Sequence, residues 1–221
     1  MEFFITGTDT GCGKTLATLT LMEALGAGGG RVAGMKPVAA GAVQTPEGLR
    51  NADALAIQAR CRPPQPYERV NPCCLATPAA PHLAARAEGR TIDLAAIHRA
   101  CDALRAEADH LVVEGVGGWR VPLDEHHEVA DLCRRLELPV ILVVGLKLGC
   151  LNHALLSTGA ILDSGAPLVG WIATSPTPEM PFEQENLAAL VERIPVPLLG
   201  HLPWQAQPDP AALARHLKLR A

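Results

Sequence analysis

Gly7-Thr8-Asp9-Thr10-Gly11-Cys12-Gly13-Lys14-Thr15 stands between a short apolar run at residues 3–5 and a stretch with helical spacing at residues 16–25. Strand, glycine-rich loop and helix, in that order, are the context of a phosphate-binding P-loop. Glycines let the chain turn tightly at the end of a strand, so that backbone N–H groups converge on one anion at the positive end of the helix. Lys14 would then contact the β- and γ-phosphates of a nucleotide, and the Thr15 hydroxyl would ligate magnesium.

The spacing of this loop departs from the usual pattern by one residue. That pattern has a glycine five residues before Gly13, but Thr8 occupies this place and the glycine comes one residue earlier, at Gly7. The alternative is a chance Gly-Lys-Thr in a surface turn. The strand and helix patterns on either side favour the P-loop.

Length and composition agree with an α/β domain that binds a nucleotide. The chain has 221 residues, of which 48% are hydrophobic, and this is enough for the core of a single domain over residues 1–221. The formal net charge of −4 argues against a nucleic-acid partner. The first residues lack the pattern of a signal peptide, and no apolar stretch has membrane-spanning length. We therefore predict a cytoplasmic protein with no membrane partner.

The seven cysteines indicate neither a disulfide framework nor a zinc site. Their number is odd, and no two of them have CxxC spacing. We interpret the adjacent Cys73 and Cys74 as loop residues rather than as a redox device.

Apolar runs that predict strands alternate with helical patterns along the chain. Strands are predicted at residues 3–6, 31–35, 111–113, 140–144, 168–173 and 196–199, and helices at residues 14–25, 92–107, 129–136, 151–164 and 184–193. Continuous runs of Val, Ile and Leu indicate strands that are buried on both faces. The sequence therefore predicts an α/β fold of the P-loop NTPase type, a mostly parallel sheet with helices on both faces. The proline-rich stretch 62–81 is expected to be irregular.

Candidate functional residues follow the predicted strands at the edge where such sheets bind ligands. Glu114, before the glycines 115, 117 and 118, suits magnesium, and the alternative is a capping carboxylate. Lys36 would add positive charge beside a transferring phosphoryl group, and the alternative is a solvated lysine at a strand end. Asp53 opens a predicted helix, where the local pattern does not separate a ligand from a structural acid.

Several separate segments together resemble one family. They are Thr6-Gly7-Thr8-Asp9-Thr10 with Gly13-Lys14-Thr15; Lys36-Pro37-Val38; Thr45-Pro46-Glu47-Gly48-Leu49-Arg50-Asn51 before Asp53; Val113-Glu114-Gly115 with Gly117-Gly118-Trp119; residues 138–145 with Lys147-Leu148-Gly149-Cys150 and Asn152-His153-Ala154; and Leu199-Gly200 with Pro203-Trp204. The chain resembles the dethiobiotin synthetases, which use ATP to close the ureido ring in the penultimate step of biotin synthesis. The longer glycine loop is part of this resemblance, which extends over nearly the whole chain.

The resemblance implies a cyclo-ligase that uses Mg²⁺ and takes ATP, 7,8-diaminononanoate and CO₂ or bicarbonate as substrates. The diamine is carbamated, the carbamate takes the γ-phosphoryl group of ATP, and the second amine displaces phosphate. The implied catalytic residues are Lys36, Lys14 and Thr10, and the implied magnesium ligands are Thr15, Asp53 and Glu114. The implied ATP-binding residues are Gly11, Cys12, Gly13, Lys14, Thr15, Leu16, Asp53, Glu114, Gly115, Val116, Gly117, Thr174, Ser175, Pro203, Trp204 and Gln205.

A homodimer with its active sites at the subunit interface is also implied. The partner would supply a substrate-binding segment, at a helix N-terminus suited to the substrate carboxylate. This segment consists of Gly149, Cys150, Leu151 and Asn152. Ala40 would line the substrate site where many relatives carry a serine, and Thr174-Ser175 replaces the Asn-Asp that relatives often present to adenine.

The main alternative is a P-loop ATPase of the partitioning or regulatory type, without ligase activity. The partitioning and membrane-cycling ATPases carry a second lysine five residues before the invariant one, and this chain has Asp9 there. Residues 211–220 could be read as a basic amphipathic membrane anchor, but alanines stand where an anchor needs bulk. We predict an ordinary terminal helix.

Overall fold

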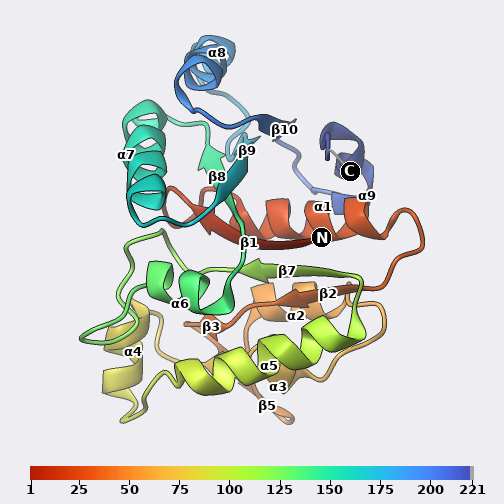
Figure 1. Cartoon of the computed structure of the whole chain (residues 1–221), viewed down its shortest axis with the longest axis vertical. Helices are drawn as coiled ribbons and strands as arrows, with labels where there is room; N and C mark the ends of the chain where they lie inside the picture. Colours follow the sequence, from red (N-terminus) through yellow and green to blue (C-terminus); the bar gives the residue numbers. More distant parts are fainter. Residues whose placement is uncertain (220–221) are drawn as a thin grey trace.

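A six-stranded parallel sheet forms the centre of the protein (Figure 1). The computed structural model describes residues 1–219. The strand order across the sheet is β10-β9-β8-β1-β7-β2, and every pairing is parallel. The strands are β1 (Glu2–Gly7), β2 (Val32–Met35), β7 (His110–Glu114), β8 (Val140–Gly145), β9 (Leu168–Thr174) and β10 (Leu198–Leu202). Because β1 lies between β8 and β7, the loop that follows it leaves the middle of the sheet edge.

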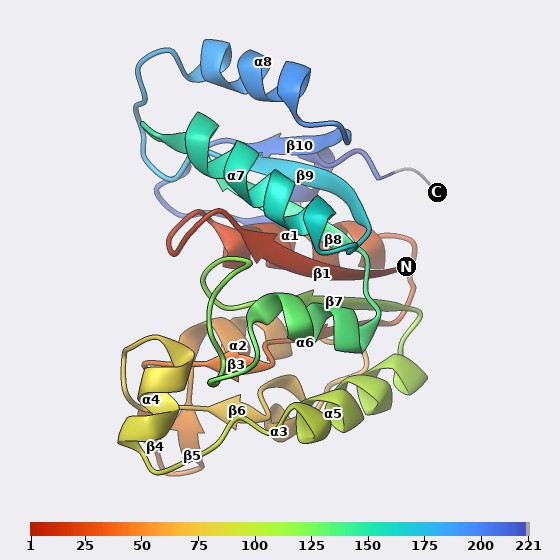
Figure 2. The same ribbon diagram turned by 60° about the vertical axis from the view of Figure 1, so that its left-hand side comes forward.

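Helices cover both faces of the sheet, as Figure 2 shows from a second direction. The first face carries α5 (Leu94–Glu107), α6 (Val129–Leu136) and α7 (Cys150–Asp163), with α8 (Glu183–Arg193) packed beside α7. The second face carries α1 (Lys14–Gly26), α2 (Ala52–Gln58) and α9 (Pro210–Leu213), which is followed by the 3₁₀ turn η1 (Ala214–His216). The predicted fold class is confirmed.

Alternating side chains of the strands supply two separate cores. Along β1, Phe4 packs into the core of the first face, whereas its neighbour Ile5 packs into the core of the second. Along β8, Leu142 and Val143 divide in the same way. Because both faces are buried, these strands carry runs of consecutive apolar residues, at 3–5 in β1 and at 140–144 in β8, in agreement with the runs in the sequence.

Smaller elements lie between β2 and α5. They are β3 (Val38–Ala39), β4 (Val43–Thr45), β5 (Gly48–Arg50), α3 (Tyr67–Val70), β6 (Cys73–Cys74) and α4 (Pro81–Ala87). β3 pairs with β6 in parallel, and β4 forms a hairpin with β5. The interpretation of Cys73 and Cys74 as loop residues is therefore wrong, and residues 62–81 contain more regular structure than predicted. The pairing with β3, which fixes this segment, is not visible in a two-residue pattern.

Two predictions near the C-terminus are wrong in their bounds. The last strand begins at Leu198 rather than at residue 196, because Pro197 has no N–H and only accepts, from the Trp171 N–H, at 3.1 Å. The terminal helix predicted over residues 211–220 ends as α9 and η1, and the Lys218 N–H then donates to the Leu199 carbonyl at 2.7 Å. Position 220 lies outside the described residues. Within residues 1–219, no helix combines the length and the apolar character needed to cross a bilayer.

Candidate active site

The glycine loop, residues 7–15, turns from β1 into α1 through two residues with left-handed backbone. Gly11 has φ 78° and Gly13 has φ 85°, a region that favours glycine. At Gly13 an added Cβ would also lie 2.8 Å from the Thr174 hydroxyl oxygen. Gly13 is the N-cap of α1 and offers no side chain to the free N–H groups of the first turn. The loop is therefore suited to bind an anion at this helix terminus.

Lys14 and Thr15, the first two residues of α1, point their polar groups to different partners. The buried Lys14 ammonium donates to the Asp9 carbonyl at 2.7 Å. The Thr15 hydroxyl donates to Oε1 of Glu114 at 3.1 Å. The second contact joins the glycine loop to the residue that ends β7.

The Lys36 cluster consists of Lys36, Asp53 and Glu114, which come from three separate segments. Lys36 follows β2 and forms an ion pair with Glu114 at the end of β7. Its ammonium also lies 3.5 Å from Oδ2 of Asp53, in the first turn of α2, and 3.3 Å from the Gly115 carbonyl. The Lys36 and Glu114 side chains are buried, whereas Asp53 is 45% exposed. Lys36 is therefore not a solvated lysine at a strand end, and Glu114 is not a capping carboxylate.

The two carboxylates keep Lys36 charged. Burial alone would lower the pKa of Lys36, but the charges of Glu114 and Asp53 and their hydrogen bonds outweigh it, so the pKa lies above its ordinary value. Lys36 is therefore a fixed cation at neutral pH and not a general base.

Glu114 retains one carboxylate oxygen without a partner. Its Oε2 is buried and has no hydrogen bond to any described residue, which is unusual for a charged group. Within the described residues, no group of three or more His, Cys, Asp or Glu side chains could hold a metal ion. The nearby donors are the Thr15 hydroxyl and the carboxylates of Asp53 and Glu114. These few hard oxygen donors fit Mg²⁺, which completes its shell with water and substrate phosphates.

A cavity of about 760 Å³ joins the glycine loop to the Lys36 cluster. It lies at the carboxyl edge of the sheet, where ligands of α/β folds bind. Its lining includes two lysines and two carboxylates, and also small apolar side chains. The apolar wall consists of Ala39, Ala40, Pro78, Ala79, Ala80, Pro81, Val116 and Val121. Such a cavity can hold phosphates on one side and an aliphatic chain on the other.

Most of the residues expected at the site lie together. Those that line the cavity are Thr10, Gly11, Gly13, Lys14, Thr15, Leu16, Lys36, Ala40, Asp53, Glu114, Val116 and Gly117. Cys12 is buried beneath the loop, and Gly115 takes part through its carbonyl. The segments that follow β1, β2 and β7 thus converge on one cavity.

None of Thr174, Ser175, Pro203, Trp204 and Gln205 lines this cavity. The Thr174 hydroxyl is buried and donates to the Cys12 carbonyl at 2.7 Å, so it stabilises the conformation of the loop. The Ser175 hydroxyl lies 2.8 Å from Nε2 of His201. The other three follow the end of β10, and Trp204 is exposed.

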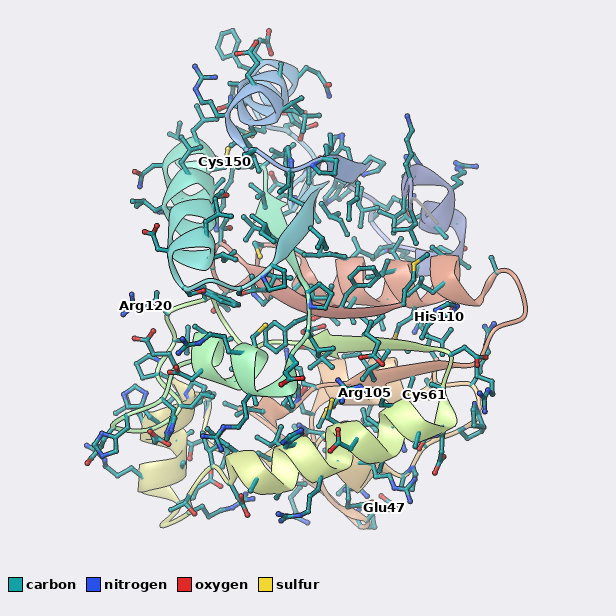
Figure 3. The ribbon with its side chains drawn as sticks, viewed as in Figure 1. Glu47, Cys61, Arg105, His110, Arg120 and Cys150 are labelled. Carbon is teal, nitrogen blue, oxygen red and sulfur yellow. The ribbon has the colours of Figure 1, made fainter. Side chains whose placement is uncertain are left out.

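The segment at the start of α7 also does not line the cavity of its own chain. Figure 3 labels Cys150, the first residue of this helix. Cys150 is buried, whereas Gly149 and Asn152 are exposed and Leu151 is partly buried. Gly149, with φ 94°, is the N-cap and provides no side-chain cap, so the first N–H groups of α7 lack a side-chain acceptor at the cap.

Sequence reasoning missed several cavity residues. Asn51, the N-cap of α2, accepts from the Ala54 N–H, and its amide nitrogen lies 3.4 Å from the Ala40 carbonyl. Asn51 ends the segment at residues 45–51 that contributes to the family resemblance, and this could have indicated a place at the site. The apolar wall gave no such indication, because small apolar side chains carry no chemical signature.

Comparisons with known proteins agree with this geometry. A family model described as AAA domain matches residues 1–212. The ATP-dependent dethiobiotin synthetase BioD of Xanthomonas oryzae pv. oryzae is 48% identical over 217 residues, which cover 98% of this chain and 97% of the relative. The enzyme of the same name from Pseudomonas aeruginosa is 49% identical over 219 residues, which cover 99% of this chain and 96% of the relative.

Solved structures of low sequence identity share the fold. The cell division protein FtsY of Thermotoga maritima has a TM-score of 0.54 at 16% identity, covering 97% of this chain and 67% of that chain. A chain of the MinC:MinD cell division complex of Aquifex aeolicus has a TM-score of 0.55 at 15% identity, covering 93% and 82%. These similarities support a P-loop NTPase fold and carry no information about the reaction.

Proposed function

The chain belongs to the family of ATP-dependent dethiobiotin synthetases, and we propose that the cavity between the glycine loop and the Lys36 cluster is where it joins CO₂ to a diamine. The family membership makes the protein a ligase that uses ATP. The substrates beyond ATP, the chemical steps and the roles of single residues are our proposal.

The proposed reaction has three steps. One amine of 7,8-diaminononanoate adds to CO₂ and loses a proton, giving a carbamate. A carbamate oxygen then attacks the γ-phosphorus of ATP, and ADP leaves with the electrons of the broken P–O bond. The second amine attacks the carbamate carbon and loses a proton, and phosphate leaves as the ureido ring closes. Negative charge moves between oxygens throughout.

Lys36 and Lys14 are the cations that would stabilise this charge. Both line the cavity, and both are buried, so their charges act in a site with little water. Lys14, at the start of α1, is placed for the β- and γ-phosphates. Lys36, from the other side, is placed for the carbamate and the transferring phosphoryl group. Thr10, at the edge of the same cavity, is placed to contact that group.

Thr15, Asp53 and Glu114 would hold Mg²⁺. The buried, unpartnered Oε2 of Glu114 and the hydroxyl of Thr15 next to it support this assignment. When bound, Mg²⁺ would neutralise charge on the ATP phosphates during phosphoryl transfer.

The apolar wall would hold the aliphatic chain of the diamine. Ala40 and its neighbours offer no side-chain hydrogen bond, so recognition on this side depends on shape. For the carboxylate of the substrate we propose the segment Gly149, Cys150, Leu151 and Asn152 of a second copy, because this segment does not reach the cavity of its own chain. The exposed Leu148, Leu155 and Leu156 beside it suit an interface of a homodimer.

The nucleoside part of ATP would extend from the glycine loop toward the ends of β9 and β10. Ser175 and the residues Pro203, Trp204 and Gln205 flank this direction. Thr174 would act indirectly, through its hydrogen bond to Cys12.

The observation that carries the proposal is the buried Lys36 ammonium, which shares one cavity with Lys14. The test incubates the purified protein with ATP, Mg²⁺, bicarbonate and 7,8-diaminononanoate. Mass spectrometry should detect dethiobiotin, and phosphate release should require the diamine. Phosphate release at the same rate without the diamine would contradict the proposal and would indicate an ATPase.

A further inference from the structure

Lys14 has one strong hydrogen-bond partner among the described residues, the backbone carbonyl of Asp9. The distance is 2.7 Å, whereas the next contact, to the Cys12 thiol, is 3.7 Å. The direction of the lysine therefore depends on how the Asp9 peptide group is held. Asp9 lies in the middle of the glycine loop and belongs neither to β1 nor to α1.

The Asp9 carboxylate is held by two side chains. The Thr8 hydroxyl donates to its Oδ1 at 2.9 Å, and Lys147 forms an ion pair with its Oδ2. Thr8 belongs to the same loop and moves with it. Lys147 follows β8 and ties the loop to another part of the sheet edge.

Lys147 itself is well anchored. It follows β8, whose six residues are all buried, and the neighbouring Leu146 N–H donates to the Thr174 carbonyl at 2.8 Å. The Lys147 carbonyl accepts the N–H of Cys150 at 2.9 Å, which closes the turn into α7. The ammonium of Lys147 thus extends from a rigid strand end to the loop.

We propose that Lys147 is a positioning residue for Lys14 and acts through Asp9. Its side chain fixes Asp9 so that the Asp9 carbonyl directs the Lys14 ammonium, and its charge cancels the Asp9 carboxylate beside the phosphate site. The inference rests on the proposed function in one respect, since it takes the glycine loop as the site of the ATP phosphates.

The charge of Asp9 makes this neutralisation necessary. Burial alone would raise the pKa of Asp9, but the hydrogen bonds from Lys147 and Thr8 and the charges of Lys147 and Lys14 outweigh it and lower the pKa. Without Lys147, a carboxylate would remain next to Lys14, where it would attract that lysine and repel the phosphates.

The test measures the Kd of a non-hydrolysable ATP analogue with Mg²⁺ by titration calorimetry. Lys147→Met should raise the Kd at least tenfold. Adding Asp9→Asn to this variant should lower its Kd at least threefold, because the uncompensated charge is gone. Asp9→Asn alone should stay within threefold of the unchanged protein, since the amide oxygen still accepts from Lys147.

Two controls separate this role from general stabilisation. Lys147→Arg keeps the charge and should bind within threefold of the unchanged protein. Arg31→Met removes a surface ion pair with Asp109. This pair lies at the start of β2 and β7, at the end of the sheet away from the glycine loop and near His110 in Figure 3. The variant should not change the Kd. Binding by Lys147→Met within threefold of the unchanged protein would overturn the proposal, as would a double variant no tighter than Lys147→Met. A failed ring closure by the unchanged protein would instead count against the proposed function.

If Lys147→Met does not fold, Lys147→Gln replaces it in these measurements, with the same expected and overturning outcomes. A loss of more than threefold in the affinity of Asp9→Asn would also overturn the proposal.

Discussion

The glycine loop and the Lys36 cluster line the same cavity but are held by different interactions. The loop is held by hydrogen bonds to its backbone, from the Thr8 N–H to the Val143 carbonyl at 3.1 Å and from the Thr174 hydroxyl to the Cys12 carbonyl, together with one ion pair between Asp9 and Lys147. The cluster is held through side-chain charges, with Lys36 between two carboxylates. The loop therefore depends on glycines that let its backbone turn, whereas the cluster depends on opposite charges, of which Lys36 and Glu114 are buried.

The largest expected effect separates the two regions by function. Lys36→Ala should lower kcat by roughly 100-fold, the loss typical of a group that stabilises charge in the transition state. The Kd of ATP should change less than threefold if, as we propose, the phosphates bind at the glycine loop. Steady-state kinetics and titration calorimetry provide the two numbers. Lys218→Ala, an exposed lysine beside the start of β10, is the matched control and should change neither.

If Lys36→Ala weakened ATP binding as much as it lowered kcat, the glycine loop and the Lys36 cluster would not differ in function. Lys36 would then be part of the nucleotide site.

The next effect concerns the backbone of the loop. Gly13→Ala should weaken ATP binding at least tenfold, because its Cβ would meet Thr174 at 2.8 Å in addition to the strain of φ 85°. Gly11→Ala has a similar φ but no atom within 4 Å of the added Cβ, so it carries only the backbone strain, and its ATP affinity should fall less than that of Gly13→Ala. Calorimetry compares the two. If both variants bind equally well, contact with Thr174 does not limit the loop.

A smaller effect is expected for the support beneath the loop. Thr174→Val removes the buried hydrogen bond to Cys12 and leaves that carbonyl unpaired, which should lower the free energy of unfolding by about 1–3 kcal/mol. The melting temperature should fall by roughly 2–4 °C for each kcal/mol. Thr174→Ser keeps the hydroxyl and should lose less. Identical melting curves for the two variants would show that the bond does not stabilise the loop.

The smallest effect is the pH dependence of the cluster. The pKa of Lys36 is raised above its ordinary 10.5, so its contribution to stability is complete below that value and is lost only as pH rises through the higher folded-state pKa. The difference in the free energy of unfolding between the unchanged protein and Lys36→Met should therefore stay constant from pH 7 to 9. Urea denaturation at three pH values measures it. A difference that shrinks by more than about 1 kcal/mol would mean that Lys36 loses its proton in this range.

Local patterns were sufficient to predict the glycine loop, α1 and the centres of the six strands. Each of these depends on residues close together in the chain, and the centres of the buried strands are runs of apolar residues. The pair β3 and β6 was not predicted, because two-residue strands have no period and their partner is far away in sequence. The end of the chain was predicted as one helix, but contact with Leu199 ends it early.

The site shows the same difference between features set by neighbouring residues and features set by residues far apart in the sequence. The position of Lys14 and Thr15 at the start of α1 could be predicted from spacing alone, since both lie within one turn of chain after the glycines. Lys36, Asp53 and Glu114 could be listed as candidates at strand and helix ends, but their ion pairs join residues far apart in the sequence. Asp53 in particular depended on the family resemblance. The apolar wall and the Asp9–Lys147 pair became visible only in three dimensions.

The central claim is that a carbamate oxygen attacks ATP in the cavity shared by Lys14 and Lys36, and oxygen labelling tests it most directly. The reaction is started with [¹⁸O]bicarbonate in unlabelled water and stopped before the label exchanges, and the released phosphate is analysed by mass spectrometry. The carbamate oxygen that attacks the γ-phosphorus stays bound to it when phosphate leaves. Each released phosphate should therefore carry one oxygen from bicarbonate. Unlabelled phosphate formed together with dethiobiotin would contradict the claim, because water would then have attacked ATP.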